Sequence, residues 1–220
     1  SEDQIQSTRE LFDVEDTNNV YETSVDANDL YNYLGIAGGD TSSLISSVMV
    51  QKQDSGTGVK VKIITQSNIT KITSNQYANA AITAGVSDVE IDVASVSKVT
   101  GESALTGVYK ALEANGETLD PDRTQVAQDE LETTNEIAQN NADDSNFDSA
   151  RLDQALVEIK QELAQIKQNQ GSAATTEQVE QVVQDALKKF NLSDIISQDD
   201  IDKLIAFAKK YQNTSAIDSQ

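Results

Sequence analysis

The sequence predicts an α+β fold, in which an N-terminal sandwich with a β-β-α-β-α centre is followed by an all-helical C-terminal region. Two observations lead to this prediction. Apolar and polar residues alternate with period two in three short runs between residues 44 and 93, and apolar residues recur at helical spacing from residue 120 onward. Strands and helices in that order usually form an open sheet covered by helices on one face.

Charge and composition divide the chain further. Residues 51–110 carry six lysines against five acids, whereas residues 111–150 carry one arginine against eleven acids. We expect five segments: a sandwich domain at 1–116, an acidic helix at 117–141, a polar linker at 142–150, a helical region at 151–213 made of a long amphipathic helix and a helical hairpin, and a flexible tail at 214–220.

The centre of the chain contains three strand-like runs. Residues 44–53 and 59–65 flank Asp54–Gly58, a loop rich in turn-forming residues, and this pattern predicts a β-hairpin. The later run, Val89–Val93, predicts a third strand. In the second and third runs, apolar side chains alternate with charged ones: Val59, Val61 and Ile63 with Lys60 and Lys62, and Val89, Ile91 and Val93 with Glu90 and Asp92.

Capping signals place the helices of the first half. Thr73 and Gln76 have the spacing of a capping box, and Gly85 provides a stop, so a helix is expected over 74–84. Thr100 is the expected cap of a second helix over 104–112, which Asn115-Gly116 ends. Upstream, residues 3–12 predict a short helix and residues 20–25 an edge strand.

The second half starts with a strong helix signal, Asp120-Pro121. The helix that follows, to about Gln139, is expected to present an acidic, solvated outer face. After a break at 170–174, apolar spacing predicts helices over 176–190 and 201–211, the second one capped by Ser197.

A heptad-like seam lies in the long helix of the second half. Its apolar residues alternate spacings of four and three over about two heptads. Two interpretations are open, since the seam can pack on the chain's own domain or mediate self-association. The seam consists of Leu152, Leu156, Ile159, Leu163 and Ile166.

Composition excludes several kinds of chemistry. The 220 residues include no Cys and no His, which removes disulfides, thiol catalysis, His-based triads and zinc–cysteine sites. The formal net charge is −21, which makes nucleic acid and anionic membranes repulsive partners. No apolar stretch is long enough to span a membrane. We expect no cofactor and no metal.

Four short patterns are candidates for catalysis or metal binding. Gly101-Glu102-Ser103 begins like a nucleophile elbow but lacks its last glycine, and Ser95 with Lys98 matches Ser-x-x-Lys without its companion motifs. Glu90, Asp92 and Glu102 are the best acids for a carboxylate-dependent hydrolase. Asp144, Asn146 and Asp148 repeat the first calcium-ligand positions of an EF-hand, but Ser149 replaces its glycine. Solvated or helix-capping roles explain all four patterns more simply.

A basic patch is the strongest candidate for binding. Lys60 and Lys62 share one strand face, and Lys52 lies across the expected hairpin. On so acidic a protein, three clustered lysines would offer an anionic polymer its best contact. Lysines that protect a sheet edge from pairing are the competing explanation.

Several longer runs identify a family resemblance. The chain resembles the YpuA-like exported proteins of Gram-positive bacteria, a domain-of-unknown-function family. The runs are Ile69–Val86, Val93-Ala94-Ser95 and Val99–Ala111, supported by Tyr33-Leu34-Gly35, Ser46-Ser47 and Gln212–Asp218.

The resemblance implies a setting rather than an activity. Such proteins are exported by a signal peptide and remain extracytoplasmic or associated with the cell envelope, so Ser1 is expected within the exported portion. We therefore expect a secreted, non-enzymatic protein that binds an envelope protein or a cell-wall polymer. The alternative is a secreted carboxylate-dependent hydrolase acting on envelope polysaccharide.

Overall fold

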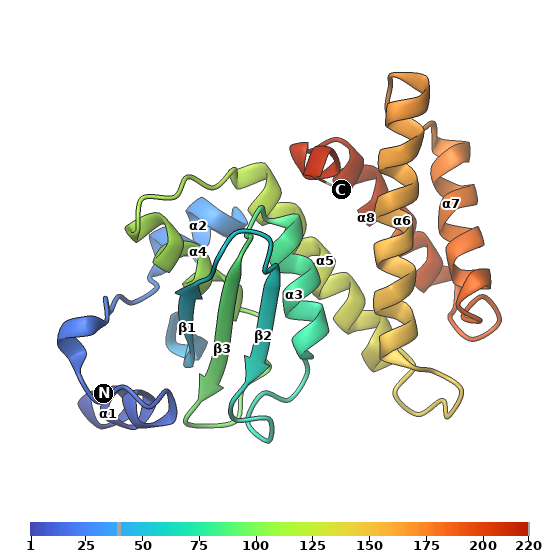
Figure 1. The fold of residues 1–220 in the computed structure, drawn as a ribbon. Coiled ribbons are helices and arrows are strands. Elements are labelled where there is room, and N and C mark those ends of the chain that lie inside the picture. Colours follow the sequence, from blue (N-terminus) through green and yellow to red (C-terminus); the bar gives the residue numbers. More distant parts are fainter. Residues whose placement is uncertain (39–40, 220) are drawn as a thin grey trace.

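The computed structural model describes residues 1–38 and 41–219 and confirms the α+β class with a helical C-terminal part. A three-stranded sheet lies in the first half, and long helices form the second (Figure 1). In chain order the elements are α1 (Glu2–Leu11), α2 (Ala27–Leu34), β1 (Ser46–Lys52), β2 (Val59–Ile63), α3 (Ser74–Thr83), β3 (Val89–Ser95), α4 (Ala104–Ala114), α5 (Pro121–Asn140), α6 (Ser149–Gln170), α7 (Thr176–Lys189) and α8 (Gln198–Gln212), with short 3₁₀ turns at Thr17–Asn19, Thr41–Ser43 and Ser215–Ser219.

The predicted hairpin is wrong, because β1 and β2 are not neighbours. The strand order is β1-β3-β2, with β3 antiparallel to β1 and parallel to β2. The third strand lies between the other two, and this central position buries Val89, Ile91 and Val93 almost completely.

The loop between β1 and β2 crosses the start of β3 and is fastened there. Gly56 and Gly58 both donate their backbone N–H to the Asp88 carboxylate at 3.0 Å. Gln53 donates to the Asp88 carbonyl at 2.8 Å. Both glycines have positive φ, which lets the loop make this crossing without steric strain. The sequence therefore predicted the loop between β1 and β2 correctly, but not the pairing of these two strands.

Helix caps follow the sequence closely at α3 and less closely at α4. Thr73 and Gln76 form the expected capping box, and Gly85 follows α3 with a φ of +95°. At α4, Ser103 and not Thr100 is the N-cap residue, and its side chain makes no capping hydrogen bond. Gly101 just before it receives the Tyr77 hydroxyl on its carbonyl at 2.5 Å, so the chain approaches α3 closely here.

Helix α5 is the central element of the molecule. It contributes Ala127 and Leu131 to the core of the sheet half, and Val126 and Ile137 to the core of the helical half. The expected acidic outer face is present, with Asp122, Glu132 and Glu136 exposed, but Glu130 is buried. Only part of the helix faces solvent, because α2 and α3 pack on one side of it and α8 on another (Figure 1).

The seam on α6 packs inside its own chain. Leu152, Leu156, Ile159 and Leu163 are buried in the core formed with α7 and α8, and Ile166 is partly buried against it. Of the two interpretations, the structure shows the intramolecular one. The four buried residues are therefore not available on the surface for self-association.

Segments near both ends of the chain differ from what the sequence predicts. Residues 20–25 do not form the expected edge strand; instead Lys110 binds the Ser24 carbonyl at 2.6 Å and anchors this segment to α4. Residues 215–219 are not a free tail. Ala216 and Ile217 are buried in the helical core, and Lys167 pairs with Asp218 at 2.6 Å. Two apolar residues are enough to hold so short a segment.

Candidate functional site

One face of the sheet is not covered by α3 and α4 and carries charge, although α1 contacts β3 and the acids of this face are partly buried. The register places Lys60 beside Glu90 and Lys62 beside Asp92 on the face opposite to α3 and α4. Lys62 also reaches Glu90, with Nζ 2.6 Å from the carboxylate oxygen Oε1. We call these four residues the open charged face. They carry two positive and two negative charges, so the face is neutral on a protein with a net charge of −21.

The pairing on this face shifts the pKa of its members. The hydrogen bond from Lys62 lowers the pKa of Glu90 and raises that of Lys62. Asp92 behaves differently, because burial first and the charge of Glu90 second raise its pKa. Its Oδ1 atom is buried with no hydrogen-bond partner among the described residues. Asp92 is thus the least stabilised acid of the face.

The structure brings two of the three predicted lysines together and separates the third. Lys52 pairs in register with Val89, on the helix-covered face, and its ammonium forms an ion pair with Glu117 after α4. Lys60 and Lys62 stay together on the opposite face. The separation has the same cause as the wrong hairpin, since β3 lies between the strands that carry these lysines.

The three acids considered for hydrolysis lie in two places. Glu90 and Asp92 share the open charged face. Glu102 lies before α4, and its carboxylate accepts a hydrogen bond from Asn135 of α5 at 3.0 Å. The hydroxyl of Ser95 is turned toward the backbone, where it donates to the Ile45 carbonyl at 3.4 Å. The arrangement does not place these acids opposite one another across a pocket.

The residues with calcium-like spacing cap local structure. Asp144 accepts the backbone N–H of Asn146 at 2.8 Å, and Asp148 accepts that of Ala150 at 2.9 Å as the N-cap of α6. Within the part of the chain that the structure describes, no group of three acidic side chains is placed to hold a metal ion.

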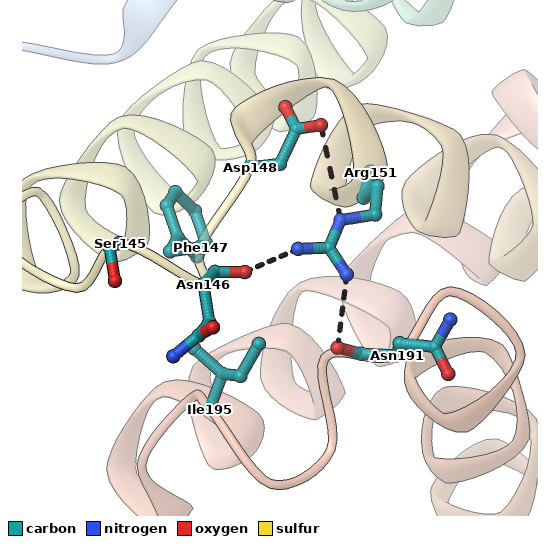
Figure 2. A pocket seen from close by; sticks show the side chains of 7 residues that line it. All are labelled: Ser145, Asn146, Phe147, Asp148, Arg151, Asn191 and Ile195. Carbon is teal, nitrogen blue, oxygen red and sulfur yellow. Dashed lines mark hydrogen bonds and ion pairs between the residues drawn. The ribbon is translucent and has the colours of Figure 1, made fainter.

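Two shallow pockets flank the loop between α5 and α6. Figure 2 shows the first, where the Arg151 guanidinium points toward the backbone of two loops. It donates to the carbonyls of Asn146 and Asn191, the second at 3.3 Å, and its Nε lies 3.9 Å from Asp148. The pocket is lined by Ser145, Asn146, Phe147, Asp148, Arg151, Asn191 and Ile195.

The second pocket lies on the other side of the same loop and shares Phe147 and Asp148 with the first. It lies where the N-terminus of α3 meets the C-terminus of α5 and the start of α6. Because the polar groups of Arg151 and Thr73 are already used by backbone partners, both pockets fit a structural role better than a ligand site.

A buried ionic cluster was not predicted from the sequence. Lys160 of α6 lies 2.8 Å from Glu130 of α5, and their side chains are 3% and 1% exposed. Thr83 of α3 donates to both Glu130 oxygens, at 3.1 and 3.0 Å, and receives Lys160 Nζ at 3.2 Å. The available signal was Lys160 itself, which follows Ile159 directly and lies four residues after Leu156 of the apolar seam.

The fold and surface define an acidic α+β protein with a mixed-charge open sheet face and a helical C-terminal part. The chain belongs to the family described as "Protein of unknown function (DUF1002)", whose model matches residues 1–220. This confirms the family resemblance of the sequence.

A relative extends this comparison. The chain is 33% identical over 169 residues to the "Uncharacterized protein YpuA" of Bacillus subtilis (strain 168). The match covers 76% of this chain and 52% of that protein, so the chain spans about half the length of its relative. No solved structure matches the chain. Among the residues described, no helix has the length and apolar character needed to cross a membrane.

Proposed function

We propose that this protein is secreted and acts at the cell envelope by binding, without catalysis, a protein or a cell-wall polymer through the open charged face. The observation that carries the proposal is the face itself. Lys60, Lys62, Glu90 and Asp92 lie side by side on the sheet face opposite to α3 and α4, with both lysines exposed. An extracytoplasmic setting is what the resemblance to exported proteins implies.

Charge explains why this face would make the contact. An anionic partner is repelled by most of a protein of net charge −21, but it meets a neutral face with two lysines here. Lys60 is exposed and forms no ion pair among the described residues, so its ammonium is free to engage a ligand. Binding is favoured over hydrolysis because Glu102 lies apart from Glu90 and Asp92, with its carboxylate bound to Asn135.

Co-sedimentation with isolated Gram-positive cell walls tests the proposal. The purified chain is mixed with native walls, with walls stripped of anionic polymers, and with each in the presence of calcium. Binding that disappears on stripping identifies an anionic polymer as the ligand, and binding that survives identifies peptidoglycan. Absence of binding in every arm overturns the wall-polymer form of the proposal and directs the search to a protein partner.

Charge-reversal variants locate the contact. Lys60→Glu/Lys62→Glu should abolish binding, whereas Lys98→Glu/Lys188→Glu, which changes the net charge equally at exposed lysines elsewhere, should not. Equal losses in both variants would indicate that only net charge matters. Fractionation of cells that express the full-length protein, followed by immunodetection, tests the extracytoplasmic setting independently.

A further inference from the structure

The contact between the two halves of the molecule is polar at its centre. Helix α3 belongs to the sheet half and α6 to the helical half, and the buried ionic cluster of Thr83, Glu130 and Lys160 joins them across α5. Buried ion pairs add little net stability but fix the geometry of a contact, since a misplaced partner leaves a charge unpaired. The geometry of this contact therefore depends on charge balance.

A second buried acid adds a further negative charge to this contact. Asp153 lies on α6 two turns before Lys160 and is 6% exposed. Its carboxylate accepts no hydrogen bond from the described residues, and the ammonium of Lys160 is already occupied by Glu130 and Thr83. Two carboxylates and one ammonium therefore lie in a region that is largely shielded from water. The hydroxyl of Tyr109, close to Glu130, is buried and unpartnered among the described residues as well.

The other charged groups around α6 do not compensate Asp153. Asp148, the N-cap of α6, adds a further negative charge, and α3 contributes only the neutral Thr83 to the cluster. The neighbouring cations are bound to other groups: Arg151 to the backbone carbonyls of Asn146 and Asn191, Lys189 of α7 to Glu158, Lys167 to Asp218, and Lys203 and Lys210 of α8 to Glu136 and Asp129 of α5.

We propose that a proton on Asp153 controls the docking of α6 against α3 and α5, so that the two halves close tightly when Asp153 is protonated and separate more easily when it is ionised. This inference does not depend on the proposed function, because it concerns the chain's own contact. It makes the relative placement of the halves sensitive to the pH of the surroundings.

The pKa of Asp153 determines in which direction, and over which range of pH, the opening equilibrium changes. Burial, and then the charges of Glu130 and Asp148, raise the pKa of Asp153 to about 7. When the contact opens, water restores the pKa toward the ordinary value of about 3.9. Because opening then releases a proton, the opening equilibrium rises about tenfold for each pH unit between these two values and levels off above pH 7.

Hydrogen exchange of the wild-type chain measures this opening. Backbone amides of α3 and of α6 around residues 153–160 are followed between pH 5.5 and 8, with rates corrected for the intrinsic pH dependence of exchange. We expect the corrected opening equilibrium to increase about eightfold from pH 5.5 to 6.5 and by less than about twofold from pH 7 to 8. The range avoids the titration of ordinary carboxylates.

Two variants and one direct titration of Asp153 test this proposal. Asp153→Asn should remove the pH dependence and hold the contact closed throughout, whereas Glu162→Gln, an exposed acid on the same helix, should keep the wild-type profile. A wild-type slope in the Asn variant overturns the proposal. So does a ¹³C carboxyl titration that places Asp153 of the wild-type chain near the ordinary value, and this measurement requires no variant to fold.

Discussion

The ion pair of Lys160 with Glu130 should lower the stability strongly when one partner is removed, but only slightly when both are replaced by apolar residues. Lys160→Met leaves Glu130 buried without a partner, and we expect the free energy of unfolding at pH 7 to fall by about 3–5 kcal/mol. The double variant Glu130→Leu/Lys160→Met, in which neither charge remains, should recover most of that loss. Urea unfolding followed by circular dichroism measures both, and equal destabilisation of the single and double variants would contradict the prediction.

Among the described glycines, Gly101 has the closest neighbouring side chains. A Cβ atom there would lie 2.7 Å from Ile69 Cγ2 and would also collide with the Tyr77 hydroxyl, at a residue with a φ of +94°. Gly101→Ala should lower the free energy of unfolding by about 3 kcal/mol or more. Urea unfolding of the variant beside the wild-type chain measures the loss.

Gly116 is the matched control for Gly101. Its φ is +88°, but a Cβ atom added at that position would have no other atom within 4 Å. Gly116→Ala should therefore cost only the conformational strain, about 1–2 kcal/mol. The difference in free energy of unfolding between the two variants measures the steric clash at Gly101. Similar losses from both would show that Tyr77 and Ile69 move aside without destabilising the protein.

Residue patterns predicted local contacts better than partners distant in sequence. Thr73 with Gln76, Asp120 with Pro121, and Gly85 were predicted correctly, because each signal and its partner lie within a few residues. The pairing of Lys160 with Glu130 and Thr83 was not predicted, since these residues are 30 or more positions apart and come together only when α3, α5 and α6 pack. The lysines and acids of the open charged face were predicted as candidates, but not their arrangement.

At the scale of elements, the C-terminal 3₁₀ turn offers a clear test of burial. Ile217 is 2% exposed in the helical core, so Ile217→Ala should lower the free energy of unfolding by about 2–4 kcal/mol. Ile5→Ala makes the same chemical change on α1, where the side chain is 45% exposed, and should cost less than about 0.5 kcal/mol. Thermal unfolding of both variants measures the contrast, and an unchanged Ile217 variant would restore the flexible tail.

Element types were predictable, but the topology of the sheet was not. Alternation and turn residues identify β1, β2 and the loop between them, yet they give no information on which strand occupies the central position. The loop is long enough for the chain to pass the end of one inserted strand, and the Asp88 carboxylate stabilises that path through Gly56 and Gly58. The predicted basic patch depended on direct pairing of β1 with β2, and Lys52 was misplaced for the same reason.

At the scale of the whole molecule, α5 couples the two cores. Leu131 is fully buried in the sheet half and Ile137 in the helical half, on the same helix. Leu131→Ala and Ile137→Ala should each destabilise both halves by about 2–4 kcal/mol, within a single cooperative transition. Calorimetry together with hydrogen exchange in β3 and α7 checks this. Two separate transitions, with only the mutated half shifted, would show that the halves fold independently.

Because α5 contributes to both cores, it also determines the order in which the chain can fold during synthesis, which begins at the N-terminus. The sheet half cannot close its core until residue 131 has emerged, and Glu130 stays without its ammonium until residue 160 follows. Over that interval of synthesis the first half therefore remains incomplete. A chain whose cores are completed late in this way cannot reach its native state until most of it has been synthesised.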